Sequence, residues 1–173
     1  MGNEMESKEI IKSQYRAVLE MLGEAIAKCP ETLWIDPGCK NRYWHVAYHA
    51  LFFTHLYLQD TEKEFVAWKK HRNEYQFLGP LPWPPHREPN IGEPYTKEEI
   101  IEYLGVCRNE VEARVSAMDL DAESGFHWLS FGKLALQFYN IRHIQHHAGQ
   151  LSDRLRTKEG IGIRWVGMKS KEV

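Results

Sequence analysis

The sequence predicts an all-α protein built as a four-helix bundle, and three observations favour this class. Apolar residues recur at three- and four-residue steps, the period of an amphipathic helix, over four long stretches. Six of the eight prolines lie together in residues 78–94, so this segment is expected to be a crossover loop between the second and third stretches. No convincing strand pattern occurs before the C-terminal tail, which favours helices packed on helices.

The first part of the chain predicts two long helices joined by a short connection. Residues 7–28 form an amphipathic pattern that Pro30 ends, because proline cannot continue a helix. The turn signal Asp-Pro-Gly lies in the connection at residues 31–40. Residues 41–59 are apolar or aromatic nearly all round, as expected for a helix buried against several neighbours.

A capping-box pattern, in which Glu follows Thr three residues later, marks two further helix starts. The pattern at residues 61–64 predicts a short helix that reaches about Tyr75, and the pattern at residues 96–99 opens the third long helix. The fourth long helix is predicted at residues 131–156, a stretch without proline. The tail, residues 157–173, is predicted to be irregular.

Length and composition narrow the class of protein. With 173 residues and 20.3 kDa, the chain is predicted to form a single domain, residues 1–173, with a substantial core. A formal net charge of −2 gives no electrostatic footprint for nucleic acid or for an anionic membrane. Three cysteines without a CxxC spacing indicate neither a disulfide framework nor a zinc ribbon. Without a secretory pattern or an apolar run of about 20 residues, a cytoplasmic protein is expected.

Two pairs of histidines form the candidate site. His143 and His147 lie four residues apart in the last long helix, and His45 and His49 have the same spacing in the second, so each pair occupies one helix face. Neutral imidazole nitrogens bind zinc, nickel, copper and iron. A single histidine on an apolar face is usually a core residue, but four at this spacing on two helices favour a shared metal ion.

Angles on an ideal helix sort the neighbouring residues. His55 lies about 120° from His49 and is therefore not expected to be a ligand. His146 lies about 60° from the first histidine of the last helix, which favours an outer position or the seam of the bundle. Tyr139 and Gln150 share the stripe of the ligand pair, so they are candidates for hydrogen bonds to a molecule bound at the metal.

The segment His143–Leu151, His-Ile-Gln-His-His-Ala-Gly-Gln-Leu, resembles the His-x-x-His-His-x-Gly-Gln-Leu motif in the last long helix of the DinB-like (DinB/YfiT) superfamily. Residues 44–53 are similar to that family's second helix. The resemblance implies an antiparallel four-helix bundle, commonly a homodimer, in which three histidines hold one divalent metal ion. Carried over by position, the ligands are His49, His143 and His147. Many members have Glu and Arg at the positions of Ile144 and Ala148, which separates this chain from activities that depend on those two side chains.

The resemblance also implies a function. Three histidines with an open position are typical of a catalytic metal site, and zinc or nickel is the expected ion. The expected activity is thiol-dependent transfer, with a low-molecular-weight thiol as small-molecule substrate, and the alternative is metal-dependent hydrolysis. His45, Tyr139 and Gln150 are the candidate catalytic residues, and His45 could instead be a fourth ligand or an outer partner. The contrasting interpretation is a non-enzymatic dimeric bundle, in which the site would be closed by His45.

Overall fold

The computed structural model describes residues 2–170 and contains five α-helices, one 3-10 turn and no β-strand in that range. The elements are α1 (Gly2–Lys28), α2 (Glu31–Trp34), α3 (Tyr43–Tyr57), the 3-10 turn η1 (Glu62–Glu64), α4 (Lys97–Ala117) and α5 (Lys133–Glu159). The prediction of an all-α protein is therefore confirmed. No helix in the described range has an apolar stretch long enough to cross a membrane.

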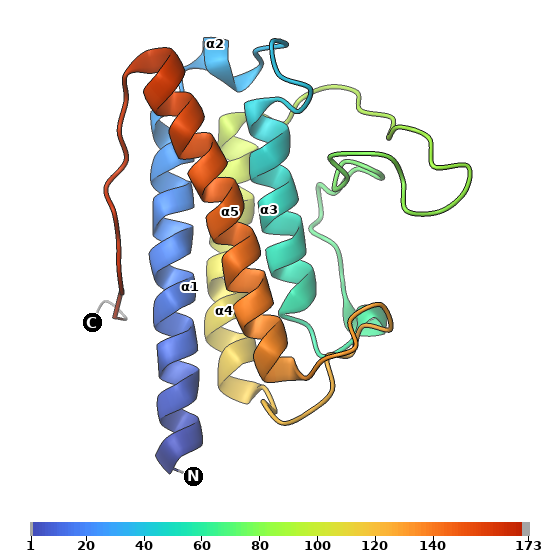
Figure 1. Cartoon of the computed structure of the whole chain (residues 1–173), viewed down its shortest axis with the longest axis vertical. Coiled ribbons are helices and arrows are strands. Elements are labelled where there is room, and N and C mark those ends of the chain that lie inside the picture. Colours follow the sequence, from blue (N-terminus) through green and yellow to red (C-terminus); the bar gives the residue numbers. More distant parts are fainter. Residues whose placement is uncertain (1, 171–173) are drawn as a thin grey trace.

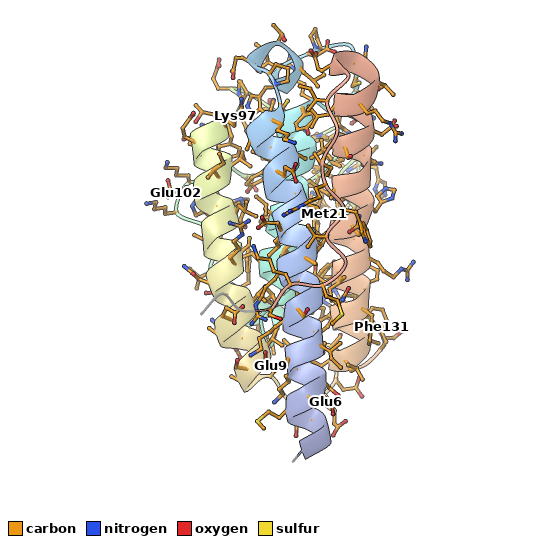
Figure 2. All side chains as sticks on the ribbon, turned by 90° about the vertical axis from the view of Figure 1, so that its left-hand side faces the viewer. Glu6, Glu9, Met21, Lys97, Glu102 and Phe131 are labelled. Carbon is orange, nitrogen blue, oxygen red and sulfur yellow. The ribbon has the colours of Figure 1, made fainter. Side chains whose placement is uncertain are left out.

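The four long helices lie side by side, and α1 and α3 each pack against both α4 and α5 (Figure 1). Figure 2 shows α1 between α4 and α5 on one face of the molecule, with Glu102 directed outward from α4. The apolar faces meet in one core, whose largest fully buried side chains include Trp34, Trp44, Tyr15, Tyr43, Tyr48, Tyr95 and Tyr103. Burial of this many rings supplies most of the driving force for the packing.

Local signals set several helix ends. α1 ends at Lys28, two residues before Pro30. The capping box at α4 is formed as predicted, because the Glu99 amide donates to Thr96 Oγ1 at 3.2 Å and the Thr96 amide donates to Glu99 Oε2 at 3.0 Å. α5 ends at Glu159, and the following residue, Gly160, adopts the left-handed conformation with φ 69° that favours glycine.

The predicted short helix from the capping-box pattern at residues 61–64 to Tyr75 is wrong. Only η1 forms there, and the Thr61 side chain makes no capping hydrogen bond. Residues 65–96 instead follow an irregular path that continues into the proline-rich loop (Figure 1). This path lets Trp68 stack on Tyr103, with ring centroids 4.6 Å apart, and buries Tyr75 against α3. Tertiary contacts of these rings therefore override a weak local preference for helix.

Two smaller predictions also need correction. The connection at residues 31–40 contains the short helix α2, whose Trp34 is buried and donates its indole N–H to the Tyr95 carbonyl oxygen at 2.9 Å. The helix α5 continues to Glu159, so the irregular tail begins three residues later than predicted. The described part of the tail runs along α1 (Figure 1), where Lys28 donates to the Gly162 carbonyl oxygen at 3.1 Å.

A buried lysine joins the beginning of α5 to the end of α3. Lys133 is 2% exposed, and its ammonium group donates to the carbonyl oxygens of Gln59 at 3.2 Å, Asp60 at 2.7 Å and Ser124 at 2.5 Å. These carbonyls belong to the residues after α3 and to the 118–132 connection, so one cation satisfies several otherwise unpaired acceptors. The contact fixes α5 relative to α3, the two helices that carry the candidate site.

Two glycine substitutions should change stability in opposite directions. Gly125 has φ 84°, and a Cβ atom there would lie 1.9 Å from the Asp60 carbonyl oxygen, so Gly125→Ala should lower the free energy of unfolding by roughly 1–3 kcal/mol. Gly105 lies inside α4, and an added Cβ atom would meet nothing within 4 Å, so Gly105→Ala should raise it by about 0.5–1 kcal/mol. Urea denaturation of both variants tests this, and equal shifts would contradict it.

Candidate metal centre

Three histidines from two helices meet at one point. His49 comes from α3, and His143 and His147 come from α5. Their ligand nitrogens all lie within 4.8 Å of one another, and His143 Nε2 lies 3.0 Å from His49 Nε2 and 3.1 Å from His147 Nε2. No other group of three or more His, Cys, Asp or Glu residues in the described part of the chain has this arrangement. The three ligands predicted from the sequence are thus brought together.

The spacing of the nitrogens fits one divalent ion. Zinc and similar metals bind imidazole nitrogen at about 2.0–2.1 Å, so two nitrogens on one ion at tetrahedral or octahedral angles lie roughly 2.9–3.4 Å apart. The two measured Nε2 separations, 3.0 and 3.1 Å, fall in this range. The cluster could therefore hold a metal ion, with the third separation within 4.8 Å.

Hydrogen bonds fix the tautomers of two of the rings. His49 Nδ1 lies 2.6 Å from the Gln76 carbonyl oxygen, and His147 Nδ1 lies 2.8 Å from Gln150 Oε1. A carbonyl oxygen only accepts, so each Nδ1 carries the proton and donates it. The Nε2 atoms of His49 and His147 are consequently unprotonated, and their lone pairs face the third histidine. Such outer partners orient metal-binding histidines and raise their basicity.

Burial keeps the three rings neutral. Desolvation lowers the pKa of His143 to about 4, with smaller contributions from the neighbouring rings of His147 and His146. It lowers the pKa of His49 well below the ordinary value and also lowers that of His147. Neutral imidazole is the form that binds metal, so protons compete weakly for the site at neutral pH. Without an ion, the two inward lone pairs can be satisfied only by an Nε2–H of His143 shared between them, whereas a cation at the centre can bind all three nitrogens.

The cluster opens toward the surface at one place on α3. His49 and Phe53 are the two residues of α3 that are only half-buried, whereas the other residues of this helix are buried. The Phe53 ring lies beside the cluster, with its centroid 4.9 Å from that of His49 and 5.6 Å from that of His143. The half-buried rings of His49, Phe53 and His143 thus give the cluster partial contact with solvent.

His45 does not join the cluster. Its side chain is 4% exposed, and its Nε2–H donates to the Tyr75 carbonyl oxygen at 2.8 Å. Burial lowers the pKa of His45, and hydrogen bonds to the carbonyl oxygens of Tyr75 and Phe77 oppose this effect. The ring thus ties α3 to the segment that follows η1, and it does not close the site as a fourth ligand.

Tyr139 and Gln150, the other two candidate catalytic residues, differ in their position relative to the cluster. The Tyr139 ring packs against Tyr57 and Phe131, each with a centroid separation of 5.8 Å, and is 39% exposed. Gln150 lies next to the ligands, but its Oε1 is bonded to His147 and its Nε2 lies 3.0 Å from His146 Nε2. The structure therefore assigns Gln150 to the orientation of a ligand, where the sequence predicted a contact with a bound molecule.

Two predictions about other histidines can be compared with the structure. His55 lies apart from the cluster, as predicted, with Nδ1 3.3 Å from the Tyr103 hydroxyl. His146 is exposed and contacts the outer Gln150, in agreement with an outer position. Gln76 was not identified from the sequence. It acts through its main-chain oxygen, which every residue has, so no side-chain pattern could have marked it.

Fold and site together define an all-helical protein with a three-histidine cluster that could hold a metal ion. Comparison of the chain with protein-family models, with curated proteins and with solved structures gave no match.

Removal of the Gln150 side chain should weaken metal binding without abolishing it. Gln150→Ala leaves His147 Nδ1–H without its acceptor, and loss of such an outer partner costs about 10- to 100-fold in metal affinity. Gln145→Ala is the matched control, because Gln145 lies on the same helix, about 160° around its axis from His143 and from His147. Zinc affinity measured by competition with a chelator tests the pair. Equal affinities of the two variants would contradict the assigned role.

Proposed function

We propose that this chain is a DinB-like, divalent-metal-binding protein whose ligands are His49, His143 and His147. The observation that carries the proposal is the convergence of three neutral imidazole nitrogens at 3.0 and 3.1 Å, two of them fixed as lone-pair donors by hydrogen bonds at Nδ1. Burial of three imidazoles at one point without a shared ligand would leave polar atoms poorly satisfied.

The arrangement of the helices agrees with the antiparallel bundle that the motif implies. Four long helices lie side by side, and the two segments that resemble the family, in α3 and α5, face one another across the cluster. Zinc and nickel both suit a site of three imidazoles, and we propose one such ion per chain. The exposed side chains of Leu134 and Phe138, one turn apart on α5, support a homodimer that covers them.

We further propose that the site is catalytic and acts on a low-molecular-weight thiol. A bound divalent ion would act as a Lewis acid and favour the deprotonated form of a thiol or of water. The chain's own residues contribute the rest. Gln76 and Gln150 hold two rings in place, and half-buried His49 and Phe53 leave an approach from solvent. His45 is engaged with a main-chain carbonyl, which favours an open site over a closed four-histidine site.

Metal content is the direct test of the site. Untagged wild-type protein should contain about one zinc or nickel ion per chain, and His147→Ala should contain little, because two histidines do not make a tight site. His55→Ala is the matched control, since this buried histidine of α3 lies outside the cluster. Elemental mass spectrometry decides the question. Equal metal content in the three proteins would refute the ligand assignment.

The thiol hypothesis can be separated from the two alternatives. In cobalt-substituted protein, a low-molecular-weight thiol should add a sulfur-to-cobalt charge-transfer band, since soft thiolate binds an open position on this ion. Absorption spectra of wild type and His147→Ala with and without the thiol make the measurement. Metal-dependent ester hydrolysis without any thiol-induced band would favour the hydrolase. Neither band nor hydrolysis, with metal bound, would favour a non-enzymatic metal-binding bundle.

A further inference from the structure

His143 differs from the other two ligands in its second nitrogen. His49 and His147 each donate Nδ1–H to an oxygen atom, whereas His143 Nδ1 is buried and has no hydrogen-bond partner among the described residues. If its Nε2 faces an ion, then Nδ1 carries the proton. A buried N–H without an acceptor is costly, and buried donors in folded proteins nearly always find one. The metal centre therefore needs one more acceptor than the two already described.

About one turn earlier on the same helix, Asn140 has a hydrogen-bond acceptor that lacks a donor. Its side chain is completely buried, and its Nδ2 donates to the Thr54 carbonyl oxygen of α3 at 3.2 Å. Because a carbonyl only accepts, the amide nitrogen must face Thr54, and this fixes the orientation of the amide group. The remaining atom, Asn140 Oδ1, is buried without a partner in the part of the chain that the structure describes. A lone acceptor thus lies three residues from a lone donor on one helix.

The surroundings of Asn140 hold it in place. Tyr15 of α1 is fully buried and donates its hydroxyl to Gln137 Oε1 at 2.8 Å. Burial raises the pKa of Tyr15, and a hydrogen bond with the Asn140 side chain opposes part of that rise. Complete burial and the hydrogen bond to Thr54 of α3 therefore leave the Asn140 side chain little freedom.

The other buried acceptor without a partner in the described residues is Gln76 Oε1. The main-chain oxygen of Gln76 lies at His49 Nδ1, and His143 lies at His49 Nε2. The two nitrogens of an imidazole ring point in widely different directions, so the His49 ring lies between the Gln76 main-chain oxygen and His143. Asn140 shares a helix with His143, and residues three apart on a helix have Cβ atoms about 5–6 Å from one another.

We propose that Asn140 is the positioning residue of His143, accepting its Nδ1–H at Oδ1 either directly or through one water molecule. This inference rests on the proposed metal site and adds the third outer partner to it. Each of the three ligands then has its own acceptor: a main-chain carbonyl for His49, an exposed amide for His147 and a buried amide for His143. The buried amide links the metal centre to α3 through its hydrogen bond to the Thr54 carbonyl oxygen.

The test compares Asn140→Leu with Asn140→Asp. Both variants lose the hydrogen bond to Thr54, but only Asp keeps an oxygen where Oδ1 stands, so their difference isolates the acceptor. Gln59→Leu is the matched control, because the Gln59 side chain is equally buried and bonds the His55 carbonyl oxygen and Glu110, away from Asn140 and His143. Two readouts are taken: zinc affinity by chelator competition, and the ring N–H signals of the histidines in zinc-loaded, ¹⁵N-labelled protein.

We expect Asn140→Leu to bind zinc about 10- to 100-fold more weakly and to lose the protected Nδ1–H signal of His143 alone. Asn140→Asp should recover most of the affinity and move that proton signal downfield, because a carboxylate is the stronger acceptor. Gln59→Leu should lower stability and leave zinc affinity and the signal unchanged.

Two results would overturn the inference while leaving the metal site intact: wild-type affinity and an intact His143 signal in Asn140→Leu, or no recovery in Asn140→Asp. If Asn140→Leu does not fold, an unshifted His143 signal in folded Asn140→Asp refutes it. Failure of the wild-type protein itself to bind zinc would instead refute the proposed function, and the inference with it.

Discussion

The packing of α3 against α5 is the constraint on which the candidate site depends. His49 lies on a helix whose residues are buried except at His49 and Phe53, and the ring faces two histidines one turn apart on α5. A slip of one residue along either helix would turn the ring about 100° away from its partners. The apolar surface of α3 and the Lys133 contacts at the far end of the pair oppose such a slip. The geometry of the site therefore depends directly on the core packing between α3 and α5.

The segment between α3 and α4 also contributes to the geometry of the histidine cluster. Three side chains of α3 bond it: His45 at the Tyr75 carbonyl, Tyr48 at His71 and His49 at the Gln76 carbonyl. The last of these bonds determines which nitrogen of His49 is available to an ion. This irregular segment carries no ligand, but it determines which nitrogen of the ligand His49 is protonated. Ring contacts with the core keep the segment in position.

Desolvation of three imidazoles without charge partners lowers the free energy of unfolding. In this protein the three rings lie together at the histidine cluster. Desolvation disfavours the protonated forms, and the neighbouring histidines disfavour them further. Functional sites commonly hold such locally unfavourable arrangements, which a large core compensates. Here the core extends over all four long helices, and the outer acceptors around the rings reduce the cost of orienting them.

The sequence by itself determined the helical class, the places of the four long helices and the two histidine pairs, because helical periodicity and four-residue spacing are local properties of the chain. The choice of His49, His143 and His147 as the converging set came from the resemblance of the motif, and the structure brings these three together. The motif in α5 also placed Gln150 beside the ligands. Its likeness to DinB-like proteins, the identity of the ion and the activity stay predictions. The tertiary structure alone decided the rest. It turned His45 toward a carbonyl, replaced the helix expected before Tyr75 with an irregular segment, and brought the Gln76 oxygen to His49. These features depend on contacts between residues about 30 positions apart, made by main-chain atoms or by rings that fill the core. Since every residue offers the same main-chain groups, only the folded path shows which of them the site uses.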